Sequence, residues 1–380
     1  MPGPFDRRSI PEYFVSSPLV ALLYPLHQVL LRLRGPPRLP PPGTTPIRVV
    51  CISDTHTLEW PDIPDGDLLI HAGDLANDGS VREIQTAVNW LRSLPHPHKI
   101  VIGGNHDSYF DTRSRLEEDR EDTTTNGTGN GFATVSASTA SIRSLDEITG
   151  SPSRIDWGDI HYLQHSSVTL EFTAPESEEV MNSSTSTLTA TNPRHLTIYG
   201  APQVPAIAGA TWGPEHAFMY PPHHDAWSRT VPPETDILVT HTPPQSHLDL
   251  SPIYSTGCPN LLAESWRIRP LLHIFGHCHC GAGSEPIFWD EAQRAWERLC
   301  ASRRSRAKHN RFVMLAGFLR DLFDPRGWID AARVVVYGML GVVWAQVWGG
   351  ENNGGGWFVN AACMYQSSGK LRNPPQVFEL

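Results

Sequence analysis

The chain has 380 residues, of which 39% are hydrophobic and 18% charged, and its formal net charge is −10 at pH 7. This hydrophobic content is enough for a substantial core and excludes a mostly disordered chain. The acidic balance argues against a general nucleic-acid binder, because such proteins usually present a basic surface. A small anionic substrate stays compatible with it, since bound metal ions can supply a local positive field.

In chain order, residues 1–45 comprise an apolar segment and then a proline-rich linker that ends at Gly43. Proline-rich runs of this kind act as stiff spacers between structured parts. We expect residues 46–380 to form one large domain. Three segments interrupt its regular pattern and are predicted to be insertions, namely residues 113–144, 176–192 and 282–355.

Residues 14–33 and 331–348 are two long apolar stretches. Prolines and a histidine interrupt the first, and the uninterrupted apolar part of the second is shorter than the ~20 residues that a bilayer span needs. Each is expected either to pack on the domain or to make a peripheral membrane contact as an interfacial helix. The six cysteines show no spacing typical of a disulfide framework, so we expect a reducing, cytoplasmic location.

Short β-branched runs recur after the linker, and most of them end at polar residues. Near-continuous apolar runs of this length are typical of strands buried on both faces of a sheet. The predicted strands cover residues 47–53, 67–72, 99–103, 195–199, 236–240, 271–275, 357–361 and 376–380. Between the second and third strands, Ile84, Val88 and Leu91 repeat at helical spacing, which predicts a helix over residues 81–94. This alternation predicts a layered α/β fold.

Residues of metal-ligand type follow nearly every predicted buried strand at its C-terminal end. In chain order they are Asp54, His56, Asp74, Asn105, His106, Asp107, His241, His277 and His279. In open α/β sheets the ligand crevice lies beyond the carboxyl ends of the strands. We therefore expect these side chains to build one shared site. Carboxylates and imidazoles together suit Mn, Fe or Zn better than Ca or Mg.

The local spacing of these residues supports the same site. In an extended segment, residues i and i+2 project to the same side. Asp54 with His56, and His277 with His279, are therefore each expected to point together. Three glycines beside them fit tight turns or a close approach of the backbone to a ligand. They are Gly73, Gly104 and Gly276.

The order of these motifs resembles that of the calcineurin-like metallophosphoesterases: Asp-x-His, Gly-Asp, Gly-Asn-His-Asp, a lone His and then Gly-His-x-His. The resemblance covers residues 47–280 and the closing strands. It looks closest to the metallophosphoesterase-domain-containing branch, similar to class III cyclic-nucleotide phosphodiesterases. Supporting runs include Val50-Cys-Ile-Ser-Asp-Thr-His56 and Leu69-Ile-His-Ala-Gly-Asp74. The resemblance implies a four-layer α/β/β/α sandwich of two mixed sheets flanked by helices.

Carried over position by position, the resemblance implies two divalent metal ions bridged by Asp74. The residues that would complete the first site are Asp54, His56 and His279, and those that would complete the second are Asn105, His241 and His277. His106 matches the family's catalytic histidine, and Asp107 would orient the His106 ring through its other nitrogen. The candidate substrate contacts are Asn105, His106 and, in the loop after Pro222, His223.

The chemistry expected of this site is hydrolysis of a phosphoester, in which two cations activate water and a histidine protonates the leaving oxygen. A small phosphodiester substrate, such as a cyclic nucleotide, is the leading hypothesis. Two alternatives stay open, a phosphomonoesterase acting on phosphoproteins or metabolites and a membrane-associated binding module with little turnover. The metal ligands alone do not separate these functions, because specificity lies in the surrounding loops.

Overall fold

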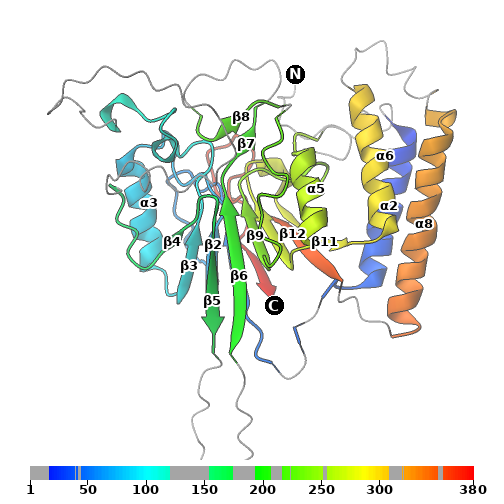
Figure 1. Ribbon diagram of the computed structural model, residues 1–380, viewed down its shortest axis with the longest axis horizontal. Coiled ribbons are helices and arrows are strands. Elements are labelled where there is room, and N and C mark those ends of the chain that lie inside the picture. The colour runs from blue at the N-terminus through cyan, green and yellow to red at the C-terminus, as the bar shows by residue number, and fades with distance from the viewer. Residues whose placement is uncertain are drawn as a thin grey trace, which may run out of the picture.

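The computed structural model describes residues 17–38, 40–41, 44–119, 154–173, 193–206, 216–222, 224–250, 255–307, 319, 321–349 and 354–380. Most of the predicted insertion at 113–144, all of the one at 176–192, and His223 lie outside these residues. The described part holds two large mixed sheets, a small two-stranded sheet and helices on several sides (Figure 1).

The first sheet has five strands, and its central part is parallel. In spatial order they are β13 (Gln376–Glu379), β1 (Arg48–Ile52), β2 (Leu68–His71), β3 (His98–Val101) and β4 (His161–Tyr162). The strands from β1 to β4 run parallel, whereas β13 pairs antiparallel with β1. The carboxyl ends of β1, β2 and β3 therefore lie at one edge of the sheet.

The second sheet has six strands and again a parallel centre. In spatial order they are β11 (Gly283–Phe288), β12 (Gly355–Asn360), β10 (Leu272–Phe275), β9 (Ile237–Thr240), β6 (Arg194–Ala201) and β5 (Ser166–Phe172). The inner strands from β12 to β6 are parallel, and the outermost strand at each edge is antiparallel. Two short strands, β7 (Val204–Pro205) and β8 (Met219–Tyr220), pair separately.

The main core lies between the two large sheets, and the side chains of β1 point alternately into this core and away from it. Val49 and Cys51 face the second sheet, while Val50 and Ile52 face the opposite side. Successive side chains of a strand point to opposite faces, so a strand buried on both faces must be apolar at every position. This requirement explains the continuous apolar runs in the sequence.

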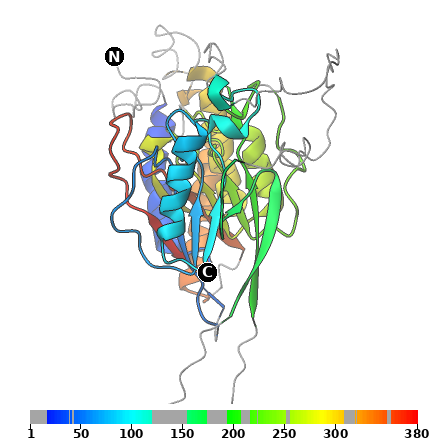
Figure 2. The ribbon, with the colours of Figure 1, turned by 90° about the vertical axis from the view of Figure 1, so that its left-hand side faces the viewer.

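Helices cover the outer faces of both sheets. Helix α3 (Val81–Ser93), capped by the Ser80 side chain, packs Ile84, Val88 and Leu91 against the first sheet (Figure 2). Helix α5 (Pro259–Ile268) packs Leu261 against Tyr199 and Leu238 of the second sheet. The order of layers is thus helix, sheet, sheet, helix, and the predicted four-layer α/β/β/α fold is confirmed.

Three further helices lie together beside the β11 edge of the second sheet (Figure 1). They are α2 (Pro18–Arg34), α6 (Glu291–Ala307) and α8 (Pro325–Gln346). The apolar stretches predicted at 14–33 and 331–348 fall on α2 and α8. Both helices contact α6 through a shared apolar cluster that includes Val20, Trp296 and Val334.

Candidate metal centre

The residues of metal-ligand type come together where the parallel strands of both sheets end. Loops after β1, β2 and β3 carry those of the first sheet, and loops after β9 and β10 carry those of the second. Three overlapping groups form there, and within each group one ligand atom per residue lies within 4.8 Å of the others. The groups are Asp54, His56 and His279; His56, Asp74 and His106; and Asp74, His241 and His277.

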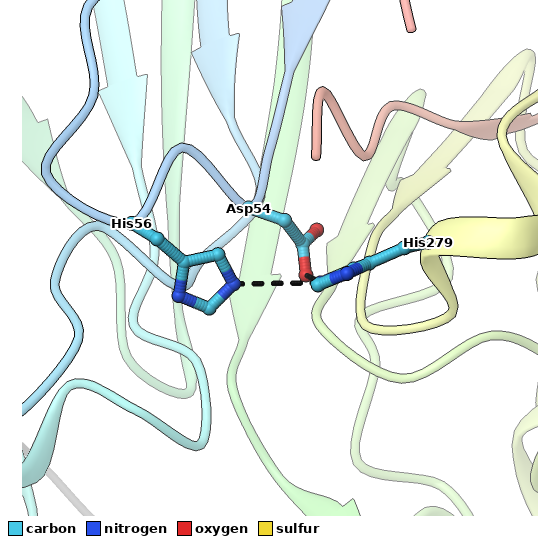
Figure 3. A group of neighbouring side chains, drawn as sticks. All are labelled: Asp54, His56 and His279. Carbon is cyan, nitrogen blue, oxygen red and sulfur yellow. Dashed lines mark hydrogen bonds and ion pairs between the residues drawn. The ribbon is translucent and has the colours of Figure 1, made fainter. Parts of the chain in front are cut away.

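In the first group, one carboxylate lies between two imidazoles (Figure 3). His279 Nε2 lies 3.1 Å from Asp54 Oδ1, and His56 Nε2 lies 3.4 Å from His279 Nε2. Asp54 also accepts hydrogen bonds from the backbone N–H of His277. Two ring nitrogens and a carboxylate oxygen that face one another at this range are donors suited to a divalent transition-metal ion.

In the third of these groups, formed by Asp74, His241 and His277, the amide oxygen of Asn105 joins the carboxylate and the imidazoles. Asn105 Oδ1 lies 2.7 Å from His277 Nδ1 and 3.1 Å from His241 Nε2. Asp74 Oδ2 lies 3.2 Å from the same His241 nitrogen. Asp74 Oδ2 also lies 3.8 Å from His56 Nε2, so its carboxylate reaches toward both groups. The structure thus divides the candidate ligands into two sets that share Asp74.

Backbone carbonyls fix the orientation of the histidine rings. The Nδ1 atoms of His56, His241 and His279 lie 3.3, 2.9 and 2.7 Å from carbonyl oxygens of Ala76, Ala72 and Gln366. A carbonyl can only accept, so each Nδ1 carries a proton, and Nε2 is the ring nitrogen that is directed into the site. Partners of this kind are typical of metal-binding histidines.

The backbone at the site is not extended, contrary to the expectation from the i, i+2 spacing. Asp54, His56, Asp74 and His277 all have φ between 47° and 65°. The side chains still converge, but a succession of left-handed residues positions them. Non-glycine residues in this region carry strain that the surrounding structure must hold in place, and such residues cluster at functional sites.

Two glycines let carboxylates approach the backbone closely. A Cβ added at Gly276 would lie 2.1 Å from Asp54 Oδ2 and 2.1 Å from Ser53 Oγ. One added at Gly104 would lie 2.3 Å from Asp74 Oδ1. Only glycine leaves room for a side-chain oxygen at these distances.

The buried carboxylates and histidines of the site shift one another's pKa values strongly. Burial acts to raise the pKa of Asp54, but the hydrogen bond from His279 and nearby histidine charges bring it to about 2. Burial opposes ionisation of Asp74 too, yet His241 and His106 hold its pKa well below the usual range. Burial acts to lower the pKa of His241, and Asp74 raises it to about 9. The two buried carboxylates therefore attract positive charge, which a bound cation supplies directly.

The predicted contact between Asp107 and the His106 ring is wrong. Asp107 accepts hydrogen bonds from the backbone N–H groups of Leu75, Ala76 and Gly104 instead. The Nδ1 atom of His106 lies 2.8 Å from the carbonyl oxygen of Asn77. Because the chain turns tightly after Gly104, the Asp107 side chain points back into the turn and joins the loops after β2 and β3. Asn77 has the orienting role that was expected of Asp107.

His216, which was not among the predicted site residues, also lies at the centre. Its Nδ1 is 3.3 Å from Asn105 Nδ2, and its ring centroid is 5.3 Å from that of His106. It lies in the short described segment that precedes β8. No motif marks this position in the sequence. Of the three candidate substrate contacts, Asn105 and His106 lie in the centre, and His223 lies outside the described residues.

The residues present fit divalent metal ions. The donor atoms are carboxylate oxygens, an amide oxygen and imidazole nitrogens whose lone pairs converge, a combination typical of Mn, Fe or Zn sites. Asp54 and Asp74 are buried, whereas the rings of His106, His277 and His279 are partly exposed. Ligand atoms are thus held inside while one side stays open to a substrate.

Three known proteins show how this chain compares with others. Metallophosphoesterase domain-containing protein 1 of Homo sapiens is 33% identical over 250 residues, which cover 64% of this chain and 63% of that protein. A UPF0046 protein of Caenorhabditis elegans is 30% identical over 241 residues, 63% of this chain and 66% of that protein. A protein of Emericella nidulans named "Probable rhamnogalacturonate lyase C" is 34% identical over 255 residues, 67% of this chain and 19% of that protein. The chain thus spans about two thirds of two of these relatives and about a fifth of the third.

A crystal structure from Thermus thermophilus aligns with 64% of this chain and 86% of its own, at 12% identity and a TM-score of 0.34. A likeness at that level supports no functional inference. Residues 47–281, more than half of the chain, match the calcineurin-like phosphoesterase family and include every metal-ligand candidate from Asp54 to His279. The chain therefore belongs to the calcineurin-like phosphoesterase family.

Proposed function

We propose that this protein is a metal-dependent phosphoester hydrolase that acts on a small phosphodiester, with cyclic nucleotides as the first substrates to test. The observation that supports this most is the division of seven ligand-type side chains into two sets that share Asp74. Backbone carbonyls orient three of the histidine rings so that Nε2 points into the site. Family membership supports the same reaction class.

In this proposal, Asp54, His56 and His279 would hold one metal ion, and Asn105, His241 and His277 would hold a second. Asp74 lies between these two sets and would serve both. Bound divalent cations of this kind neutralise phosphoryl oxygens and lower the pKa of water. The Asp and His donors favour Mn, Fe or Zn. The protein part of the work is to keep the two carboxylates ionised and the imidazole lone pairs directed inward.

His106 is the proposed general acid. Its ring is partly exposed at the rim of the centre, and its backbone N–H donates to Asp74 Oδ1 at 2.9 Å. The Asn77 carbonyl keeps the proton on Nδ1, so Nε2 is the nitrogen left to exchange a proton with the leaving oxygen. A positioned acid of this type contributes about 10²–10⁴-fold to a reaction rate.

His216 and Asn105 are the proposed contacts to the phosphate. The two side chains lie side by side, and the His216 ring also faces the ring of His106. Imidazole and amide groups can donate hydrogen bonds to phosphoryl oxygens without changing the metal ligands. A small substrate is favoured over nucleic acid because the net charge is −10, whereas nucleic-acid binders usually present a basic surface.

The test compares initial rates for bis(p-nitrophenyl) phosphate and p-nitrophenyl phosphate, each with Mn²⁺, Fe²⁺ or Zn²⁺ and with chelator. The same preparation is then assayed with 3′,5′- and 2′,3′-cyclic nucleotides. We expect metal-dependent turnover, a higher kcat/KM for the diester, and hydrolysis of at least one cyclic nucleotide. A higher kcat/KM for the monoester would replace the diesterase proposal with a phosphomonoesterase. No turnover of any substrate by metal-loaded protein would contradict the hydrolase proposal.

A further inference from the structure

The three-helix layer of α2, α6 and α8 is a folded unit with its own interior. Leu19, Leu23 and Leu299 are among the buried residues of its cluster. The ring of His27 stacks on Trp296 at a centroid distance of 4.7 Å. The inner sides of α2 and α8 are therefore occupied, and only their outer sides remain available.

Ion pairs fix the arrangement of these helices. Arg303 of α6 is buried and pairs with Asp321 and Asp324 before α8, at 2.5 and 2.6 Å. At the opposite end, Arg34 of α2 pairs with Asp290 before α6 at 2.5 Å. Helix α6 is thus antiparallel to its two neighbours, and α8 is held in the layer at its first turn.

Helices α2 and α8 run parallel and in direct contact. The Ser17 hydroxyl donates to Asp321 at one end, and Gln346 Nε2 donates to the Leu33 carbonyl oxygen at the other. Between these ends, a Cβ added at Gly338 would lie 2.9 Å from a methyl group of Leu30, so the helices are closely packed. We call the exposed sides of α2 and α8, which lie outside the apolar cluster that they share with α6, the outer face.

This outer face is apolar along most of its length. On α8, exposed apolar residues recur at helical spacing and include Ile329, Val336, Met339, Leu340, Trp344, Val347 and Trp348. On α2, the exposed stripe consists of Leu22, Leu26, Val29 and Leu33. Only 17% of the most apolar 18-residue window of α8 is buried, and by length and composition alone this helix could cross a membrane. Exposed apolar surfaces of this extent mark interaction sites.

Among the described residues of α2 and α8, arginines outnumber acidic residues. Helix α2 contains no acidic residue, and its Arg32 is exposed. On α8, Arg326 and Arg333 are exposed. The single acidic residue of α8, Asp330, pairs with Arg298 of α6 at 3.0 Å and with Arg333 at 3.4 Å. The remainder of the chain is acidic overall. A face that combines apolar residues with cations is complementary to a membrane with anionic lipids.

We propose that the outer face of α2 and α8 docks on the surface of an anionic membrane, with both helices lying in the membrane plane. Exposed tryptophans suit this position, because indole rings favour the boundary between headgroups and acyl chains. A second copy of the chain fits less well, since two such faces would bring arginines toward arginines. A span is disfavoured by the contacts that join α8 to α6 and α2. This surface is separate from the metal centre, and its test needs no hydrolysis.

The test is flotation of purified full-length protein with phosphatidylcholine vesicles, with and without 30% phosphatidylserine. The test variant combines Leu26→Glu with Leu340→Glu, which places one acid on each helix of the face. A matched control combines Leu58→Glu with Val377→Glu, because both are exposed apolar residues outside the three helices. Circular dichroism and thermal unfolding establish that each variant is folded, and light scattering gives its mass.

We expect the wild type and the control to float with serine-containing vesicles and to be released by alkaline carbonate. The test variant should bind at least about tenfold less, since a carboxylate in the apolar boundary is costly. Equal flotation of the test variant, or no flotation of the wild type, would overturn the proposal. If the wild type is a dimer that does not bind vesicles and the test variant is a monomer, the face binds a second copy of the chain instead of a membrane. Retention after carbonate would replace docking with a span.

Discussion

Single residues at the centre are held in unusual conformations by close contacts. Asp54 and Asp74 both have left-handed backbone conformations. Each carboxylate lies so close to a glycine that a Cβ atom at the glycine position would clash with it. The sequence predicted tight turns or a close approach of the backbone to a ligand at Gly73, Gly104 and Gly276. The groups found against Gly104 and Gly276 are the carboxylates of Asp74 and Asp54. It could not predict the left-handed conformations, because they depend on how loops from two sheets meet.

Gly276→Ala tests this packing. The new Cβ would lie 2.1 Å from Asp54 Oδ2, so the carboxylate that contacts His279 through Oδ1 must shift from its position. We expect a loss of about 1–3 kcal/mol in the free energy of unfolding, as in other overpacked interiors, together with weaker metal binding. Chemical denaturation and metal titration measure the two effects. Gly354→Ala is the matched control, because nothing lies within 4 Å of the Cβ added there. Equal stability and equal metal affinity of the two variants would refute the packing argument.

His106→Ala tests the proposed general acid. Because a poor leaving group needs a proton more than a good one does, the loss in kcat/KM should depend on the substrate. We expect kcat/KM to fall by about 10²–10⁴-fold for an alkyl phosphodiester and by much less for a p-nitrophenyl diester. The metal content should be unchanged. His216→Ala should instead raise KM for both substrates by a similar factor. The general-acid role would be refuted by equal losses for the two leaving groups in the His106→Ala variant.

Whole elements differ in how readily the sequence reveals them. Strands buried on both faces, such as β1 and β9, appear as unbroken apolar runs. The edge strand β5 was missed because it alternates: Val168, Leu170 and Phe172 face the core and the residues between them are polar. The edge strand β11 contains Pro286 and lies in a segment predicted to be an insertion. A proline is tolerated there because an edge strand pairs on one side only.

One buried histidine links the second sheet to the three-helix layer. His247 lies 2.6 Å from Glu285 of β11 and 3.2 Å from Glu297 of α6. Burial acts to lower its pKa, but the two carboxylates raise it to about 10. The ordinary pKa of an unfolded histidine is near 6.5. Since the folded pKa is the higher one, the pair stabilises the protein fully below about pH 6.5, and this stabilisation is lost as pH rises toward 10.

His247→Gln should therefore lower the free energy of unfolding by about 3–5 kcal/mol at pH 6.5, the usual cost of breaking a buried ion pair. The gap between wild type and variant should narrow as pH rises to 10. Urea unfolding across this pH range provides the measurement. His195→Gln, an exposed histidine on β6, is the control and should show no such trend. A gap that stays constant with pH would contradict the ion-pair account.

At the scale of the whole molecule, the metal centre depends on both sheets at once. Loops after β1, β2 and β3 meet loops after β9 and β10, so neither sheet alone holds a complete set of ligands. The sequence predicted this meeting, because the ligand types recur at strand ends and carboxyl ends of parallel strands share an edge. It could not predict His216 or the partner of Asp107. Those contacts depend on loops whose course no local pattern specifies.

The most direct test of the proposed centre is Asp74→Asn, with metal content and diester hydrolysis measured on the same samples. Asp156→Asn makes the same chemical change at an aspartate whose side chain is 73% exposed. We expect the wild type and the control to bind two metal ions and to hydrolyse the diester. Asp74→Asn should bind less metal, and its diesterase activity should fall by more than ~100-fold. That factor is the upper end of what mutating a residue that hydrogen-bonds to a metal ligand costs. Wild-type metal content and turnover in Asp74→Asn would contradict the shared role of Asp74 in the centre.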